Sequence, residues 1–400
     1  MERAQQLVQD EERFAACLEA VARSERIGLD TESNSFHAYF EKVCLVQIAT
    51  PEADWIVDPL ALPLQPLIPL LRDPAREVIL HAAEYDVLCL KRDYGLTFGR
   101  IFDTHAAAKA LGIEKVGLQN LLKDQFGVDS TVDEQRSDWG RRPLSKDQIE
   151  YAFADVKHLL PLREKLSAEL TARGLLGEAE AEFARLVAKE PRERPFDPEA
   201  WQRMKAARTL DGRGRQVLRE LFLLRDRRAR ELNRPAFKVL SDLFLSEVAR
   251  RLPKTEAELA QVPGTSAGAL KKIADQVLEA VRTGLAGEPL PKPRPGAGQK
   301  PGQYRKGGPG APPPEVEERF ELLRAWRKAR AELRKVEVQV IAPNAVLWAI
   351  ARENPVDLPA LGKVPGMDGF RLDSYGAEMI AVLKTAKPAP AAPPVQGQLF

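Results

Sequence analysis

The sequence predicts an α/β domain followed by two small all-helical domains. From Arg26 onward, short apolar runs bounded by turn residues alternate with helical segments, which is typical of a sheet covered by helices. Beyond about residue 200 only helical patterns remain, and a Pro/Gly-rich stretch interrupts them once. A length of 400 residues is enough for two to three such domains.

The α/β region begins with three consecutive strands that we expect to form a meander. They are the apolar runs Ile27–Asp30, Val43–Ala49 and Trp55–Val57. A helix, a buried strand and a second helix follow, at Gln65–Arg72, Glu77–His81 and Tyr85–Tyr94, and Gly95 ends the last of them. A long helix is expected from Ser145, which has capping-box spacing to Gln148, through Leu166 toward Gly174.

Composition marks the boundaries between domains. Prolines among charged residues at 187–200 separate a first domain, 1–190, from a second, 200–285. Residues 286–314 hold nine Pro, seven Gly and five Lys or Arg against one Glu, so we expect a flexible basic linker. A third domain, 315–385, and a disordered tail, 386–400, complete the chain.

The two helical domains are weak copies of each other at an offset of 102 residues. Six residues of the first recur in the second: Arg225, Arg228, Leu259, Val262, Pro263 and Gly264 match Arg327, Arg330, Leu361, Val364, Pro365 and Gly366. Duplication of a small domain explains the match, and chance similarity between two helical segments is the alternative.

Charge is unevenly distributed between the halves of the chain. Residues 1–200 carry a formal charge of −11 and residues 201–400 carry +13. The basic half therefore suits a polyanion such as nucleic acid, although ordinary helix faces can also differ in charge. Three scattered cysteines exclude a disulfide framework. Without an apolar stretch of membrane-spanning length or a signal peptide, we expect a cytoplasmic protein.

Four carboxylates and one phenol lie at the ends of apolar elements. Asp30 and Glu32 are two residues apart on the first strand and share a face. Asp86 follows a buried strand, and Tyr151 stands one helical turn before Asp155. Each feature alone is ordinary: a polar strand end, an acid in the first turn of a helix, a surface pair.

Brought together, the four acids would repel one another and raise their pKa values unless cations neutralised them. Oxygen ligands without a Cys/His cluster favour Mg²⁺ or Mn²⁺, and two such ions are suited to phosphodiester cleavage. The Tyr151 hydroxyl could then orient the attacking water.

These residues and their neighbours resemble the DEDD 3′–5′ exonucleases of the tyrosine subtype and, within them, the ribonuclease D family. Three motifs within residues 20–175 carry the resemblance: Leu29-Asp30-Thr31-Glu32, His81-Ala82-Ala83-Glu84-Tyr85-Asp86 and Tyr151-Ala152-Phe153-Ala154-Asp155-Val156. It implies a ribonuclease-H-like fold with Asp30, Glu32, Asp86 and Asp155 holding two metal ions and Tyr151 placing the water. Glu150 stands where the sister subtype has histidine, which supports the tyrosine subtype.

The C-terminal half resembles a duplicated helicase-and-RNase-D C-terminal (HRDC) domain, clearly at 200–285 and more faintly at 315–385. Such domains commonly bind nucleic acid, and phosphate neutralisation agrees with the basic charge. The alternative is that these two blocks only pack on the catalytic domain.

Other candidate residues surround the motifs. His81 would touch substrate or be an ordinary core histidine, and Asp103 is expected to cap the helix from Thr104. Trp139, Arg141 and Arg142 precede the catalytic helix on a loop, where a stacking ring and two cations would suit a 3′-terminal nucleotide.

The resemblance implies a metal-dependent 3′–5′ exoribonuclease that trims structured RNA such as tRNA precursors and releases nucleoside 5′-monophosphates. The alternatives are a 3′–5′ DNA exonuclease in repair and a non-catalytic nucleic-acid-binding protein. The final residues, Gln396–Phe400, resemble peptides with which bacterial proteins bind the DNA sliding clamp.

Overall fold

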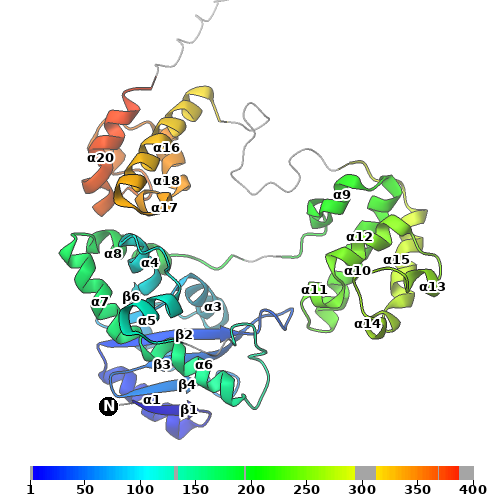
Figure 1. The fold of residues 1–400 in the computed structure, drawn as a ribbon, viewed down its shortest axis with the longest axis horizontal. Helices are drawn as coiled ribbons and strands as arrows, with labels where there is room; N and C mark the ends of the chain where they lie inside the picture. The colour runs from blue at the N-terminus through cyan, green and yellow to red at the C-terminus, as the bar shows by residue number, and fades with distance from the viewer. Residues whose placement is uncertain (1–2, 130–133, 193–194, 293–311, 368, 387–400) are drawn as a thin grey trace, which may run out of the picture.

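The computed structural model describes residues 3–129, 134–192, 195–292, 312–367 and 369–386, and it forms one α/β domain and two helical domains (Figure 1). Each domain has its own apolar core. Most of the linker, residues 293–311, and the tail with Gln396–Phe400 lie outside the described residues. None of the helices in the described ranges is long and apolar enough to span a membrane.

A mixed six-stranded sheet with the order β1-β4-β3-β2-β5-β6 forms the centre of the α/β domain. The predicted meander is confirmed as the antiparallel strands β2 (Arg26–Ser33), β3 (Val43–Ala49) and β4 (Ala53–Val57). β5 (Glu77–Leu80) and β6 (Arg100–Asp103) continue the sheet in parallel beyond β2. The edge strand β1 (Ala4–Val8) was not predicted, because Gln5 and Gln6 interrupt its apolar pattern.

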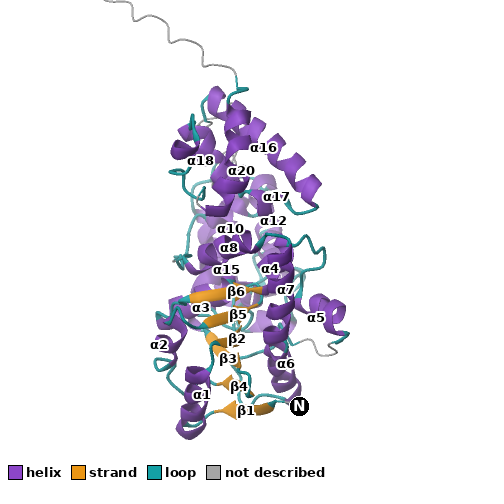
Figure 2. Cartoon of the chain, turned by 90° about the vertical axis from the view of Figure 1, so that its left-hand side faces the viewer, coloured by secondary structure: helices purple, strands orange, loops and turns teal. Residues whose placement is uncertain are grey.

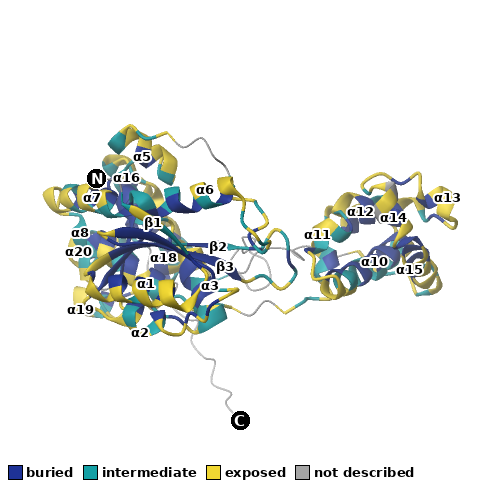
Figure 3. Ribbon diagram, turned by 90° about the horizontal axis from the view of Figure 1, so that it is seen from below, coloured by how far each residue is buried: buried dark blue, intermediate teal, exposed yellow. Residues whose placement is uncertain are grey.

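Helices cover both faces of this sheet (Figure 2). One face carries α1 (Glu11–Arg23), α2 (Leu67–Arg72) and α3 (Glu84–Tyr94), whereas α4 (Thr104–Ala110), α5 (Leu118–Phe126), α6 (Lys146–Lys157) and α7 (Leu159–Ala172) lie on the other side. The strands between them are buried, and the outward helix surfaces are exposed (Figure 3). α8 (Leu176–Val187) then packs against β6 and α4.

The single long helix expected from Ser145 is two helices that meet at His158. The physical reason is Pro161, because a proline ring clashes with the carbonyl four residues earlier, here that of Lys157. That carbonyl accepts a hydrogen bond from Arg3 instead. Pro161 therefore separates α6, which faces the meander, from α7.

Three predicted helix ends are confirmed. Ser145 and Gln148 form a complete capping box at the start of α6. Asp103 accepts hydrogen bonds from the amides of His105 and Ala106 and so caps α4. α3 ends at Gly95 in the left-handed conformation.

The two helical domains follow α8 in the chain. The first contains the short helices η1 (Ala200–Arg203) and α9 (Lys205–Thr209), then α10 (Gly212–Glu231), α11 (Ala236–Val239), α12 (Asp242–Arg251), α13 (Glu256–Leu259), α14 (Ala267–Lys271) and α15 (Ala274–Ala286). The second contains α16 (Pro314–Arg334), α17 (Val338–Ile341), α18 (Asn344–Glu353), α19 (Leu358–Leu361) and α20 (Gly369–Leu383).

The two helical domains share the same internal contacts at the offset of 102 residues. In the first, Arg225 donates to the Leu240 carbonyl at 3.4 Å and to Asp242 at 2.5 Å. In the second, Arg327 donates to the Ala342 carbonyl at 2.7 Å and to Asn344 at 2.8 Å. The glycines of the two Val-Pro-Gly turns, Gly264 and Gly366, both have positive φ, at 100° and 84°. These equivalent contacts support duplication over chance similarity.

The second helical domain is attached to α8 and α4 by a buried ion pair. Arg334, the last residue of α16, binds both carboxylate oxygens of Glu178 at 2.8 Å and donates to the Ala110 carbonyl at 3.1 Å. Lys109 also pairs with Glu337 at 3.0 Å. Because Glu178 is only 7% exposed, Arg334 neutralises a buried charge at this interface.

The first helical domain touches the loop between β2 and β3, residues 34–42. The Tyr39 hydroxyl donates to Asp226 at 2.7 Å, and the Phe40 amide donates to Asn233 at 3.0 Å. These contacts place α10 beside the loop that begins directly after Glu32 and Ser33.

Candidate active site

The three carboxylates of Asp30, Glu32 and Asp155 form one group. β2 presents Asp30 and Glu32 on the same face of the sheet, and α6 packs on β2, β3 and β4 and brings Asp155 to them. One carboxylate oxygen from each residue lies within 4.8 Å of the other two. This is the only group of this kind among the residues that the structure describes.

Asp86 adjoins this group from the first turn of α3. Thr31 lies between Asp30 and Glu32 on β2, and its hydroxyl donates a hydrogen bond to the Asp86 carboxylate at 2.5 Å. Asp86 is nearly fully buried and does not belong to the 4.8 Å group. The structure thus brings together three of the four predicted acids and places the fourth next to them.

Burial raises the pKa of all four carboxyl groups, and their mutual repulsion raises it further. The pKa of Glu32 reaches about 10 and that of Asp155 about 7. Asp30, Asp86 and Asp155 are the charged groups that raise the pKa of Glu32, and no cationic side chain in the described part of the chain offsets them. A cluster that needs positive charge and offers only oxygen atoms fits a divalent cation.

Tyr151 lies on α6 one turn before Asp155. Burial raises the pKa of the Asp155 carboxyl, and the hydrogen bond from Tyr151 offsets part of this rise. Burial and the nearby carboxylates raise the pKa of Tyr151 above its ordinary value. The raised pKa favours the neutral phenol form of Tyr151, which is able to donate a hydrogen bond.

Trp139 does not lie where the sequence predicted. Its side chain is fully buried against Cys44, Leu45 and Ile56, with its ring centre 6.0 Å from that of Tyr151. A ring enclosed in this way cannot stack on a nucleotide, so the prediction of substrate stacking was wrong. Trp139 instead supports the face of α6 that carries Tyr151.

The Arg142 guanidinium also makes its hydrogen bonds within the protein. Its guanidinium donates two hydrogen bonds to Asp58, at 2.6 and 2.8 Å, and one to the Cys44 carbonyl at 2.8 Å. These contacts leave it unsuited to the predicted phosphate contact, and they lower the pKa of Asp58 despite its burial. Arg141 is exposed beside it, so its predicted role stays open.

His81 is hydrogen-bonded to Thr104, the first residue of α4. Because the Thr104 hydroxyl donates to the Leu80 carbonyl at 3.0 Å, it accepts from His81 Nδ1 at 2.9 Å. Burial lowers the pKa of His81 to about 3, so the ring is neutral. This environment is that of a core histidine, and a contact with substrate remains a prediction.

Exposed aromatic side chains close in sequence to Glu32 and Asp86 were not predicted. Phe36 and Phe40 lie on the loop after β2, and Tyr85 lies next to Asp86 in sequence; these side chains are 46%, 60% and 45% exposed. The Tyr85 hydroxyl is 2.8 Å from that of Ser33, which connects the first turn of α3 to the end of β2. Aromatic residues in a polar loop directly after Asp-x-Glu are the sequence feature that could have revealed them.

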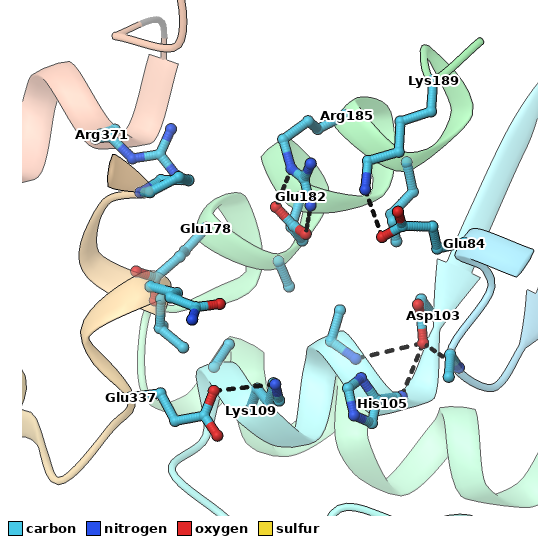
Figure 4. Close-up of a pocket in the computed structure, with 18 of the residues that line it drawn as sticks. Glu84, Asp103, His105, Lys109, Glu178, Glu182, Arg185, Lys189, Glu337 and Arg371 are labelled. Atoms are coloured by element: carbon cyan, nitrogen blue, oxygen red, sulfur yellow. Dashed lines mark hydrogen bonds and ion pairs between the residues drawn. The ribbon is translucent and has the colours of Figure 1, made fainter. Parts of the chain in front are cut away.

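A separate cavity of about 580 Å³ lies between α4, α8 and the second helical domain (Figure 4). Six of its charged side chains form the ion pairs Lys109–Glu337, Arg185–Glu182 and Lys189–Glu84. Glu178 is neutralised by Arg334. Glu84, Glu178, Glu182 and Glu337 in this cavity therefore have basic partners, unlike the acids of the carboxylate cluster.

Family models match the α/β domain and both helical domains. The model described as 3′–5′ exonuclease matches residues 5–171, and the HRDC domain model matches residues 214–281 and again 316–383. The two HRDC matches have the same length and differ by 102 residues. The HRDC assignment of both helical domains is therefore confirmed.

Two ribonucleases D match nearly the whole chain, and a third protein matches most of it. Ribonuclease D of Gluconacetobacter diazotrophicus is 33% identical over 382 residues, which are 94% of this chain and 92% of the relative. The crystal structure of Escherichia coli RNase D, an exoribonuclease involved in structured RNA processing, matches with a TM-score of 0.61 and 25% identity over 95% of this chain and 98% of that one. The catalytic core of RRP6 from Trypanosoma brucei matches 71% of this chain and 80% of its own length, with a TM-score of 0.65 and 25% identity. This chain is therefore a 3′–5′ exoribonuclease that belongs to the ribonuclease D family.

Proposed function

We propose that this enzyme trims the 3′ ends of structured RNA such as tRNA precursors and releases nucleoside 5′-monophosphates. Two Mg²⁺ or Mn²⁺ ions would be held by Asp30, Glu32, Asp86 and Asp155. The observation that carries the proposal is that Asp30, Glu32 and Asp155 each place a carboxylate oxygen within 4.8 Å of the other two, with the buried carboxylate of Asp86 beside them. Burial and the neighbouring carboxylates raise the pKa of these acids, which agrees with a site for cations.

When bound, the ions would stabilise the charge that develops on the phosphate and make the attacking water more acidic. Two side chains of the protein then position the water and one of the carboxylates. Tyr151, neutral and hydrogen-bonded to Asp155, orients the water. Thr31 holds Asp86 in place through its hydroxyl, so the fourth carboxylate keeps a fixed position beside the other three.

The surface around the acids supports binding of a single-stranded 3′ end. Phe36, Phe40 and Tyr85 offer exposed rings, and base stacking on such rings is worth about 1–3 kcal/mol per base. Arg141 adds an exposed cation. The first HRDC domain contacts the same loop through Tyr39 and Phe40, and the half of the chain that contains both HRDC domains carries +13. Together these features suit a substrate with a folded body and a short single-stranded end.

The test is cleavage by the Asp30→Asn and Asp155→Asn variants. Each removes one charge from the ion-binding group, so we expect hydrolysis to fall by at least about 100-fold. RNA affinity, measured by filter binding in EDTA, should change little. Asp147→Asn, an exposed acid on the same helix α6, is the matched control and should retain full activity.

The substrate is tested with 5′-labelled RNA and DNA of matched sequence, each a duplex with a 3′ overhang, and with a tRNA precursor that has a 3′ extension. We expect progressive shortening of both RNAs from the 3′ end in Mg²⁺ or Mn²⁺. Preferential cleavage of the DNA would contradict the proposed substrate. Normal turnover by Asp30→Asn would contradict the proposed ion site.

A further inference from the structure

Gln47 is a buried polar side chain without a partner. All seven residues of β3 are buried, and the side chains around Gln47 on this strand are apolar. Gln47 itself is 0% exposed, and neither its amide nitrogen nor its amide oxygen has a hydrogen-bond partner among the described residues. Such groups are rare in folded proteins, so this one requires an explanation.

The strand register places Gln47 directly opposite Asp30. β2 and β3 are antiparallel, and Asp30 pairs with Gln47 just as Glu32 pairs with Leu45. Side chains of paired residues point to the same face, with Cβ atoms about 4.5–5.5 Å apart. This is the face that α6 covers with Tyr151 and Asp155. The amide therefore lies next to the carboxylate cluster, between the sheet and α6.

Stability alone does not account for a glutamine at this position. An unpaired buried amide is destabilising, whereas an apolar side chain of similar size would pack as Leu45 and Ile56 do on the same face. The amide offers N–H donors to a group that only accepts hydrogen bonds, and ionised carboxylates are such groups. Asp30 is the carboxylate opposite it.

We propose that Gln47 is a positioning residue of the cation site. Asp30 would help to hold the cation, and the Gln47 amide nitrogen would donate a hydrogen bond to the Asp30 carboxylate that lies opposite it. This bond fixes the orientation of Asp30 and thereby raises cation affinity. The inference rests on the proposed ion site and adds a residue outside the three acidic motifs.

The experiment measures Mn²⁺ binding to the full-length protein by isothermal titration calorimetry and the melting temperature of the metal-free protein. Gln47→Leu and Gln47→Met remove the amide and retain the volume. We expect Mn²⁺ affinity to fall about tenfold in both. The metal-free melting temperature should stay the same or rise, because an unpaired polar group has been removed. Leu45→Met, opposite Glu32 on the same two strands, is the matched control and should leave Mn²⁺ affinity unchanged.

The outcomes separate the inference from the proposed function. A lower melting temperature with unchanged Mn²⁺ affinity would show that Gln47 has only a packing role and would overturn the inference, while the ion site would stand. Equal loss of affinity in Leu45→Met would overturn it as well, because the effect would then come from general repacking. If the wild-type protein bound no Mn²⁺ at neutral pH, the ion site itself would be wrong, and the inference with it.

Discussion

Buried carboxylates occur in two contrasting environments in this enzyme. At the interface with the second HRDC domain, Glu178 is paired with Arg334 through two hydrogen bonds of 2.8 Å. In the carboxylate cluster, Asp30, Glu32 and Asp155 lie together, and the charges that raise the pKa values of this cluster are other carboxylates. An arginine side chain neutralises Glu178, which therefore stabilises the interface. The clustered carboxylates have neighbours of the same charge, which suits them to bind a metal cation.

Other buried acids follow the first pattern. Glu77 pairs with Arg163 at 2.6 Å, and Asp58 pairs with Arg142 at the same distance. The hydrogen bonds of Asp58 lower its pKa despite burial, whereas burial and the neighbouring carboxylates raise the pKa of Glu32 in the cluster. The charge of the neighbouring groups therefore differs between these two acids.

The largest effect is expected from Arg334→Ala, which leaves Glu178 buried without its cation. Loss of one partner of a buried pair costs about 3–5 kcal/mol, so the second HRDC domain should detach from α8. Small-angle scattering should show a larger radius of gyration, and limited proteolysis should cleave the linker faster. Arg330→Ala, which breaks a partly exposed pair with Glu378 inside the same domain, should leave both measurements unchanged. Equal behaviour of the two variants would mean that the ion pair does not hold the interface.

A smaller effect of opposite sign is expected from Asp155→Asn in EDTA. This substitution removes one charge from a repelling group and keeps an acceptor for the Tyr151 hydroxyl. We expect the free energy of unfolding of the metal-free protein to rise by roughly 2 kcal/mol at pH 8. Chemical denaturation with and without Mn²⁺ checks this, since only the wild type should be stabilised strongly by the ion. Destabilisation in EDTA would show that Asp155 has a structural partner.

The smallest effect is expected on the free energy of unfolding of the metal-free protein, which should depend on pH between pH 7 and 8.5. The pKa of Glu32 is about 10 in the folded protein against an ordinary value of 4.5, so the folded state holds a proton that the unfolded chain has lost. Stability therefore falls as pH rises, by about 1 kcal/mol per pH unit. Unfolding free energies in EDTA should show this slope in the wild type and a weaker one in Glu32→Gln. Identical slopes in the two proteins would show that Glu32 is ionised throughout this range.

Much of the fold could be predicted because local patterns decide it. The meander, the capping box at Ser145 and the helix end at Gly95 each depend on residues that are close in sequence. β1 depends instead on pairing with β4, and its own residues do not show it. The break between α6 and α7 was visible as Pro161, but the continuous apolar pattern on either side concealed it.

The acids of the site could be predicted because they come in short motifs, but the surroundings could not. Trp139 and Arg142 stand on a loop in a polar segment, which suggested exposure, yet long-range contacts with β3 and Asp58 bury the ring and occupy the guanidinium. Gln47 became notable only when the strand register placed it opposite Asp30. Contacts between residues far apart in the chain cannot be predicted from the residues next to each of them.

The ion pair of Arg334 also bears on how the two HRDC domains diverged. At the equivalent position, 102 residues earlier, the first copy has Leu232, whose side chain is 49% exposed. The internal scaffold has been retained in both copies, including the contacts of Arg225 and Arg327. The two copies differ at this helix end, and they contact different parts of the α/β domain. A charged helix end that pairs with Glu178 in one copy is thus an exposed leucine in the other, so the same domain scaffold presents a docking residue in only one of its two positions.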